Sequence, residues 1–191
     1  MDSRELYLGL ILIIVFERLG ELLLTRRNAA RLLARGGFAA GEAHYPAMVL
    51  LHTAILVGAP LEVYLLGRDF LPWLGLPMLA LVGGTMALRY WAISTLGDRW
   101  TTRILVVPGE PPVTGGPYRF VRHPNYLAVI VEVAALPLVH SAWLSALLFS
   151  LANAAVLRLR IRAEEAALAR ASAYLEKLGD RPRFLPGRAD G

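Results

Sequence analysis

Long apolar runs alternate with arginine-rich polar segments along this chain. Three of the runs are long enough, as helices, to cross the hydrocarbon core of a membrane: residues 6–24, 45–66 and 70–93. Two shorter apolar runs follow in the second half, at residues 126–139 and 142–157. The pattern therefore predicts an all-α integral membrane protein.

The two shorter runs can be joined in two ways. Pro137 and the pair His140-Ser141 lie between them, which favours a helical hairpin whose arms are completed by flanking residues. One long continuous helix is the alternative, because 14 and 16 apolar residues are each short for a membrane span. A hairpin brings the polar connection before it (residues 94–122) and the charged segment after it (residues 158–165) to the same side of the membrane, whereas a single helix separates them.

The basic residues predict which side each segment occupies. Most of the 20 lysines and arginines follow the first, third and fifth apolar runs, whereas Arg4 and Arg68 fall on the other side. The positive-inside rule then places the N-terminus outside and the arginine-rich segments in the cytoplasm. We expect about five transmembrane helices in a single domain (residues 1–191). Residues 1–93 would form three N-terminal spans, and residues 94–191 a polar loop, the hairpin and a C-terminal cytoplasmic helix that reaches Gly179.

Composition supports the membrane assignment and removes several kinds of chemistry. Hydrophobic residues make up 56% of the chain, above the roughly 45–50% that is usual in soluble domains. Cysteine is absent, which excludes disulfides and thiolate chemistry, and four scattered histidines predict no metal site. The net charge of +5 favours membrane lipids as partners over nucleic acid, because no nucleic-acid-binding motif accompanies it.

Two polar segments carry the candidate chemistry. Residues 115–126 combine two glycines, two prolines, two tyrosines, two arginines and a histidine, which suits either a ligand-binding surface or a decorated turn before a helix. In the segment after the hairpin, Arg160 and Glu164 are one helical turn apart and share a face, next to a stripe that holds Arg158, Arg162 and Glu165. A surface helix with ion pairs would explain the second segment alone. The convergence of both segments on one side of the membrane favours a site.

These segments resemble the isoprenylcysteine carboxyl methyltransferase family. The resemblance rests on Gly116-Pro117-Tyr118, on Arg122-His123-Pro124-Asn125-Tyr126, on Arg160-x-Arg162-x-Glu164-Glu165 and on the tail Arg183-Phe184-Leu185-Pro186-Gly187. It implies an integral membrane enzyme that methylates a lipophilic acceptor with S-adenosyl-L-methionine, at a cytoplasmic cofactor pocket. The first half resembles a bacterial subgroup, which implies a bacterial inner membrane.

The resemblance also implies roles for individual residues. Arg160 corresponds to the arginine that the family uses at the substrate, and Glu165 is the second candidate catalytic residue. The implied cofactor-binding residues are Val113, Tyr118, Arg122, His123, Pro124, Asn125, Tyr126 and Glu164.

The methyl acceptor and two other functions stay open. A carboxylate of the isoprenylcysteine kind needs no base and can be oriented by Arg160, whereas a phenol or enol lipid needs a base such as His123 or Glu165. In either case a lipophilic or prenylated substrate would enter laterally from the bilayer. The alternatives are a membrane NADPH-dependent reductase of the sterol-reductase type and a non-enzymatic scaffold or transporter subunit. No oligomeric state is predicted.

Polar residues inside the apolar runs give weaker expectations. Arg18 can pair with Glu21, and His52 and Glu62 are expected to form hydrogen bonds between helices. Arg89 is expected to extend toward the cytoplasmic interface, or else to help shape the pocket. The four tryptophans are expected to lie at the membrane interfaces: Trp73, Trp91, Trp100 and Trp143.

Overall fold

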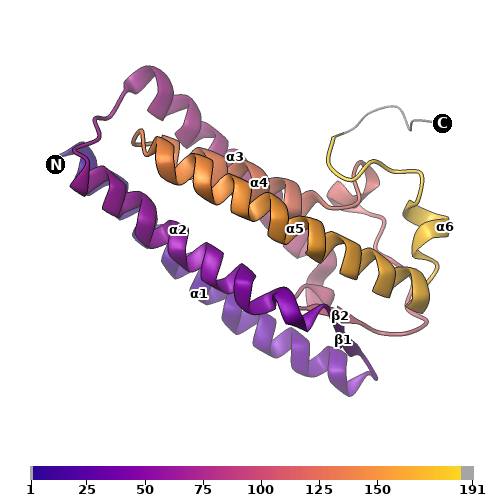
Figure 1. Ribbon diagram of the computed structural model, residues 1–191. Helices are drawn as coiled ribbons and strands as arrows, with labels where there is room; N and C mark the ends of the chain where they lie inside the picture. The colour runs from indigo at the N-terminus through magenta and orange to yellow at the C-terminus, as the bar shows by residue number, and fades with distance from the viewer. Residues whose placement is uncertain (1, 186–191) are drawn as a thin grey trace.

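The computed structural model describes residues 2–185, and its helices run alongside one another in an elongated bundle (Figure 1). The helices are α1 (Ser3–Ala34), α2 (Tyr45–Leu65), α3 (Pro72–Leu96), α4 (Pro124–Leu138), α5 (Trp143–Ala171) and the short α6 (Tyr174–Leu178). Two strands, β1 (Phe38–Ala40) and β2 (Ile104–Val106), and the 3₁₀ turns η1 (Glu42–His44), η2 (Gly97–Arg99) and η3 (Gly116–Arg119) complete the elements. Pro186 and Gly187, part of the tail resemblance, lie outside the described residues.

The two ends of the bundle differ. The N-terminus, the α2–α3 connection and the α4–α5 turn lie at one end, and the strands, α6 and the segment toward the C-terminus lie at the other (Figure 1). We call the second end the sheet end. Because α1 to α5 alternate in direction, each polar segment that follows α1, α3 and α5 returns to the sheet end.

Three helical segments are long and apolar enough to cross a membrane: Glu42–Leu65, Pro72–Arg99 and Trp143–Ala171. No more than a third of the residues in their most apolar windows is buried in the bundle. Their outward apolar faces require an apolar surrounding, and the chain is an integral membrane protein. The expected count of about five spans stays a prediction, because α4 has 15 residues and α1 carries Glu17, Arg18 and Glu21 within its apolar stretch.

The second half forms the helical hairpin, and not one long helix. The chain turns through Val139–Ala142, where Ser141 has a positive φ of 57°. Glu62 of α2 then caps α5 by accepting hydrogen bonds from the backbone amides of Leu144 (3.2 Å) and Ser145 (2.7 Å). The helix expected to continue to Gly179 breaks after Ala171, and α6 turns back over the sheet end.

Charged side chains pair with one another inside the bundle. Arg18 of α1 forms ion pairs with Glu21 (3.0 Å) and with Glu132 of α4 (2.6 Å). Arg89 is buried and binds Glu21, so it does not extend to an interface. A buried guanidinium is stable only with such partners. Arg89 also lines an internal cavity described below, which agrees with the alternative expectation that it helps shape the pocket.

Two further expectations are corrected. His52 is expected from the sequence to form a hydrogen bond to a neighbouring helix. Its Nδ1 atom instead lies 2.8 Å from the carbonyl oxygen of Met48, which belongs to the same helix. Trp100 is only 3% exposed and packs inside the sheet end, whereas Trp73 is 71% exposed as an interface residue should be.

The hydrophobic pattern does not predict the two short strands. They pair antiparallel, with Phe38 opposite Val106 and Ala40 opposite Ile104. The pairing ties the segment after α1 to the polar loop after α3. It gives that loop a fixed course over the sheet end, where it forms one wall of a cavity.

Candidate active site

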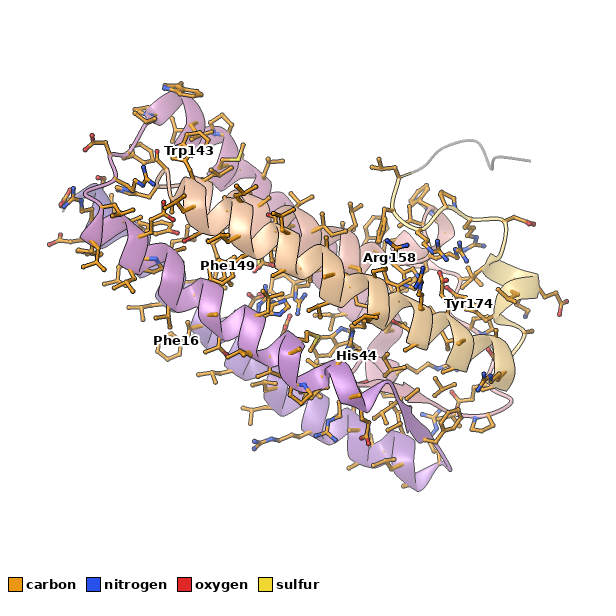
Figure 2. The ribbon with its side chains drawn as sticks, viewed as in Figure 1. Phe16, His44, Trp143, Phe149, Arg158 and Tyr174 are labelled. Atoms are coloured by element: carbon orange, nitrogen blue, oxygen red, sulfur yellow. The ribbon has the colours of Figure 1, made fainter. Side chains whose placement is uncertain are left out.

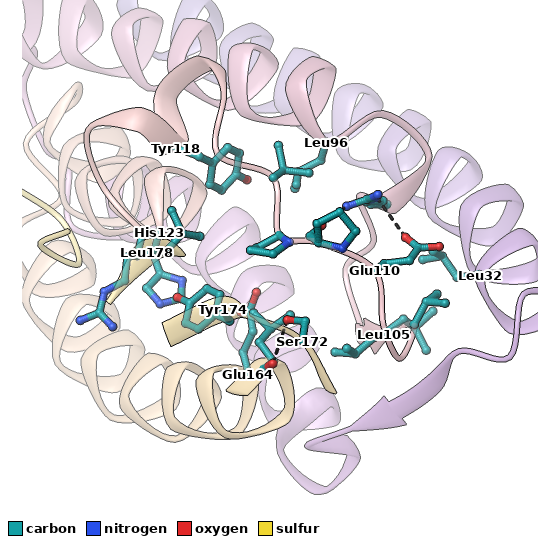
Figure 3. Close-up of a pocket in the computed structure, with 18 residues that line it drawn as sticks. Leu32, Leu96, Leu105, Glu110, Tyr118, His123, Glu164, Ser172, Tyr174 and Leu178 are labelled. Atoms are coloured by element: carbon teal, nitrogen blue, oxygen red, sulfur yellow. Dashed lines mark hydrogen bonds and ion pairs between the residues drawn. The ribbon is translucent and has the colours of Figure 1, made fainter. Parts of the chain in front are cut away.

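A cavity of about 150 Å³ opens at the sheet end between the polar loop, the start of α4, the end of α5 and α6. In Figure 3 the side chains of Tyr118, His123, Glu164, Tyr174 and Glu110 surround this hollow from different segments. Apolar contacts come from Leu32, Leu96, Leu105, Val106, Leu168 and Leu178. The site is therefore assembled from parts of the chain that are far apart in sequence.

The local sequence explains why the motif before α4 holds its shape. Gly116 has a φ of 53°, and a Cβ at this position would collide with the side chain of Thr95. Pro124 then begins α4 as its first residue, a position that does not need a backbone N–H. The backbone amides of Arg122 and His123 donate to the carbonyls of Pro182 (2.9 Å) and Arg183 (3.1 Å). The motif is thus fixed between α3 and the C-terminal segment.

The Tyr126 hydroxyl joins the two candidate segments. It donates a hydrogen bond to the Glu164 carboxylate and accepts one from Nε of Arg160 at 2.8 Å. Arg160 also donates to the carbonyl oxygen of Thr102 at 2.5 Å, which orients its guanidinium from two sides. The predicted meeting of residues 115–126 with residues 158–165 is therefore present in the structure.

Glu165 forms a second junction beside the cavity. Its Oε1 lies 3.0 Å from Nε2 of His123 and 3.4 Å from Arg122, and its Oε2 accepts a hydrogen bond from Arg183 at 2.7 Å. The His123 ring stacks on Tyr126 with centroids 5.3 Å apart. Glu165 thus holds the motif and the C-terminal segment together, and it does not line the cavities described here.

A second cavity, of about 100 Å³, continues from the first, with which it shares Tyr118, Arg122, His123 and Glu164. Asn125, Tyr126 and Arg160 enter the lining there, together with Trp100, Thr101 and Arg103 of the polar loop.

A third cavity, which we call the chamber, lies deeper among the helices. It measures about 180 Å³, and its lining is mostly apolar. It shares Tyr126, Arg160 and Asn125 with the second cavity. Leu22 of α1 and Val49 of α2 line it and are themselves exposed, which places its mouth between these two helices.

The structure places most predicted site residues around these three spaces. Val113, Tyr118, Arg122, His123 and Glu164 line the first cavity. Asn125, Tyr126 and Arg160 line the second cavity and the chamber.

Two predicted residues stand apart from the spaces. Pro124 is fully buried in the first turn of α4, lines none of the three spaces and shapes the site through the backbone. Glu165 reaches the site through His123.

Other residues at the site carry no signal in the sequence. Tyr174, Ser172 and Leu178 reach the first cavity because the helix breaks after Ala171, and Leu105 reaches it because β2 pairs with β1.

The predicted residue Asn125 accepts a hydrogen bond from Arg89 at 3.0 Å, which links the site to the buried Arg89–Glu21 pair.

The electrostatics of the first cavity suit a zwitterionic polar ligand. The Tyr174 hydroxyl and Nε of Arg122 are buried, and neither forms a hydrogen bond of normal geometry within residues 2–185, although the Tyr174 hydroxyl lies near the Arg122 side chain. Burial, with Glu164 nearby, raises the pKa of Tyr118 well above its ordinary value, and burial with Glu165 and Glu164 does the same to the pKa of Tyr174. Both tyrosines therefore stay neutral donors, beside the carboxylate of Glu164.

The fold and site define a helical membrane protein that can hold a polar molecule at the sheet end, next to an apolar molecule among its helices. Residues 77–170 match the sequence model of the isoprenylcysteine carboxyl methyltransferase (ICMT) family. The chain belongs to this family and is a membrane methyltransferase.

Two relatives match over most of their length. The uncharacterized protein YpbQ of Bacillus subtilis is 38% identical over 159 residues, which cover 83% of this chain and 94% of YpbQ. An uncharacterized protein of Haemophilus influenzae is 27% identical over 154 residues, which cover 79% of this chain and 88% of that protein.

Proposed function

We propose that this protein transfers a methyl group from S-adenosyl-L-methionine to a lipophilic acceptor. The observation that carries the proposal is the position of Tyr126 and Arg160, which line both the second cavity and the chamber. A polar donor at the sheet end and an apolar acceptor among the helices would meet at this pair of side chains. Methyl transfer depends mainly on such alignment and on exclusion of water.

The residues around the first cavity suit the proposed donor. Glu164 offers a carboxylate for its ammonium group, and the unpaired donors on Arg122 and Tyr174 suit its carboxylate. Tyr118 and the neighbouring leucines offer an aromatic and apolar surface for its adenine. When bound, S-adenosyl-L-methionine would supply a methyl group that passes from sulfur to an acceptor oxygen, while the electron pair of the broken bond stays on sulfur.

Arg160 is the residue that would orient the acceptor. Two of its nitrogens are held by Tyr126 and Thr102, which fixes the guanidinium at the joint between the two spaces. A fixed guanidinium can bind the oxygen of a carboxylate of the isoprenylcysteine kind, or of a phenol or enol lipid. For a phenol or enol, His123 is the better-placed base because it lines both polar cavities, whereas Glu165 is held by His123, Arg122 and Arg183 and acts as a positioning residue.

The proposed orientation puts the sheet end in the cytoplasm of a bacterium, with the N-terminus outside the inner membrane. The support is that the arginine-rich last turns of α1 and α5, with the segments that follow α1, α3 and α5, gather at the sheet end, while Arg4 and Arg68 lie at the other end. A cytoplasmic sheet end would give the site direct access to the methyl donor. The mouth of the chamber between α1 and α2 would admit the acceptor laterally from the bilayer.

Calorimetry of the purified protein with S-adenosylhomocysteine and with NADPH tests the proposal. We expect S-adenosylhomocysteine alone to bind, and we expect Glu164→Gln to weaken that binding by roughly 10- to 100-fold, because a hydrogen bond to a charged group is lost. Glu176→Gln is the control, since Glu176 is exposed on α6 and lines none of the cavities. Binding of NADPH alone would establish the reductase alternative, and binding of neither ligand would favour a scaffold.

A further inference from the structure

A groove separate from the candidate site runs along the outer side of the α4–α5 hairpin. Its volume is about 520 Å³, and of its lining residues only Leu157 also lines the chamber. Ile130 and Ala134 of α4, Ala154 and Ile161 of α5, and Phe184 of the C-terminal segment provide most of its apolar surface. The groove and the candidate site therefore lie on different sides of α5.

One end of the groove is strongly basic. Arg158 and Arg162 are one turn apart on α5, both are exposed, and neither forms an ion pair with any residue between 2 and 185. Arg183 lines the same end with a half-exposed side chain that also contacts Glu165. Figure 2 shows Arg158 on the side of α5 that faces the segment leading to the C-terminus. Two guanidinium groups without an ion pair in residues 2–185, and a third that binds Glu165, make this end of the groove attractive to an anionic group such as a phosphate.

Two polar atoms lie deeper in the groove without partners. The side chains of Ser150 and Asn153 line it, and their Oγ and Oδ1 atoms are buried and form no hydrogen bond within the described part of the chain. Asn153 precedes Arg158 by five residues, about 7.5 Å along the helix axis. An occupant made only of hydrocarbon would leave both atoms unsatisfied, which is unfavourable in an apolar surrounding. An occupant suits these two residues better if it carries polar groups between about 1.4 and about 2.2 helical turns below its charged head.

We propose that this groove binds an anionic phospholipid of the surrounding leaflet. Its phosphate would lie on Arg158, Arg162 and Arg183, its glycerol and ester groups near Ser150 and Asn153, and an acyl chain along the apolar wall. A phospholipid presents these three kinds of group in this order. The inference rests on the membrane location of the chain and not on the identity of the methyl donor or acceptor.

Binding at the groove would also affect the junction that holds the candidate site. Arg183 contacts Glu165, and Glu165 contacts His123. A lipid phosphate on Arg183 would fix the C-terminal segment in place over the groove. We expect the anionic lipid to raise the thermal unfolding midpoint of the full chain.

The first test is native mass spectrometry of the delipidated full chain, titrated with dioleoyl phosphatidylglycerol or dioleoyl phosphatidylcholine. We expect the anionic lipid to bind preferentially, with one tight site. Arg158→Gln/Arg162→Gln should weaken that site by roughly 30-fold, because each arginine near an anionic head contributes a factor of about five. Arg26→Gln/Arg27→Gln removes the same charge from exposed positions of α1 and should leave the site unchanged. Equal weakening by both pairs, or equal binding of both lipids, would overturn the proposal.

A second pair of variants tests the groove itself without changing charge. Ala154→Phe places a ring in the groove and should abolish the tight site, whereas Ala155→Phe adds the same ring to an exposed neighbouring position outside the lining. Circular dichroism checks that both variants keep their helical content. If the folded Ala154→Phe variant retained the lipid as the parent does, the lipid would bind elsewhere and the proposal would fail.

Discussion

At the scale of single residues, the Tyr126 hydroxyl is the point on which the candidate site depends. It contacts Glu164, which faces the proposed donor, and Arg160, which faces the proposed acceptor. The two charged residues therefore share one neutral partner and do not pair directly. This arrangement leaves Glu164 and Arg160 available to separate ligands on the two sides of the Tyr126 hydroxyl.

Arg160→Lys should separate the two roles. Lysine keeps the positive charge but cannot bind Tyr126, Thr102 and an acceptor oxygen with one planar group. We expect methyl transfer from a radiolabelled donor to extracted membrane lipids to fall at least about tenfold. The affinity for S-adenosylhomocysteine, measured by calorimetry, should change by less than about threefold.

The exposed Arg170 of α5 gives the matched control for that experiment. Arg170→Lys should transfer methyl groups at the parent rate. Full activity of Arg160→Lys would remove Arg160 from the acceptor role, and a parallel loss of cofactor affinity would assign it to the donor pocket.

At the scale of elements, the α4–α5 hairpin returns the charged end of α5 to the motif that begins α4. The turn between the two arms is short and lies at the end of the bundle farthest from the site. The direction in which α5 runs is therefore determined by how its first residues are held. Glu62 of α2 fixes this start, because its carboxylate accepts hydrogen bonds from two amides at the positive end of the helix and pairs with Arg68. The hairpin is thus held by a neighbouring helix at the end farthest from the site.

Glu62→Gln should therefore destabilise the protein although it lies far from the cavities. The amide keeps the size of the side chain but loses its charge, so the pairing with Arg68 and with the α5 terminus weakens. We expect a loss of about 1–2 kcal/mol in the free energy of unfolding, seen as a lower thermal midpoint. Asp180→Asn, at an exposed position without an ion pair in residues 2–185, should leave the midpoint unchanged. An unaltered midpoint in Glu62→Gln would show that the cap does not stabilise the hairpin.

At the scale of the whole molecule, the proposed function depends on the two ends of the bundle lying on opposite sides of a membrane. The polar loop, β1, β2, α6 and the C-terminal segment all gather at the sheet end (Figure 1). Ion pairs connect the segments at this end; for example, Glu110 of the polar loop pairs with Arg35, which follows α1, and with Arg99. The proposed orientation places this whole assembly in the cytoplasm.

The absence of cysteine from the sequence makes this orientation directly measurable. A membrane-impermeant maleimide should label Asp69→Cys, in the α2–α3 connection, in intact spheroplasts of a bacterial host. It should label Asp180→Cys, at the sheet end, only after the membrane is opened. Both positions are exposed on the surface of the protein, so the maleimide can reach the new cysteine in each variant. The reverse pattern of labelling would invert the proposed topology.

Much of the membrane architecture, and the two polar segments that contribute to the site, could be predicted from the sequence, because each of these features depends on residues that are close together in the chain. The apolar runs, the hairpin, the sidedness of the arginines and the motif before α4 are of this kind. The spacing of Arg160 and Glu164 on one helical face likewise follows from local geometry.

Tertiary structure alone decided the contacts between distant segments. Arg89 pairs with Glu21, 68 positions away, and Arg18 pairs with Glu132, 114 positions away. The sequence shows that these charged residues lie within apolar runs, but it does not show which residue each one pairs with. The pairing of β1 with β2 and the break after Ala171 bring Leu105 and Tyr174 to the first cavity. Such contacts depend on how the helices pack. A buried charge is stabilised only when helix packing places an opposite charge or a hydrogen-bonding group next to it.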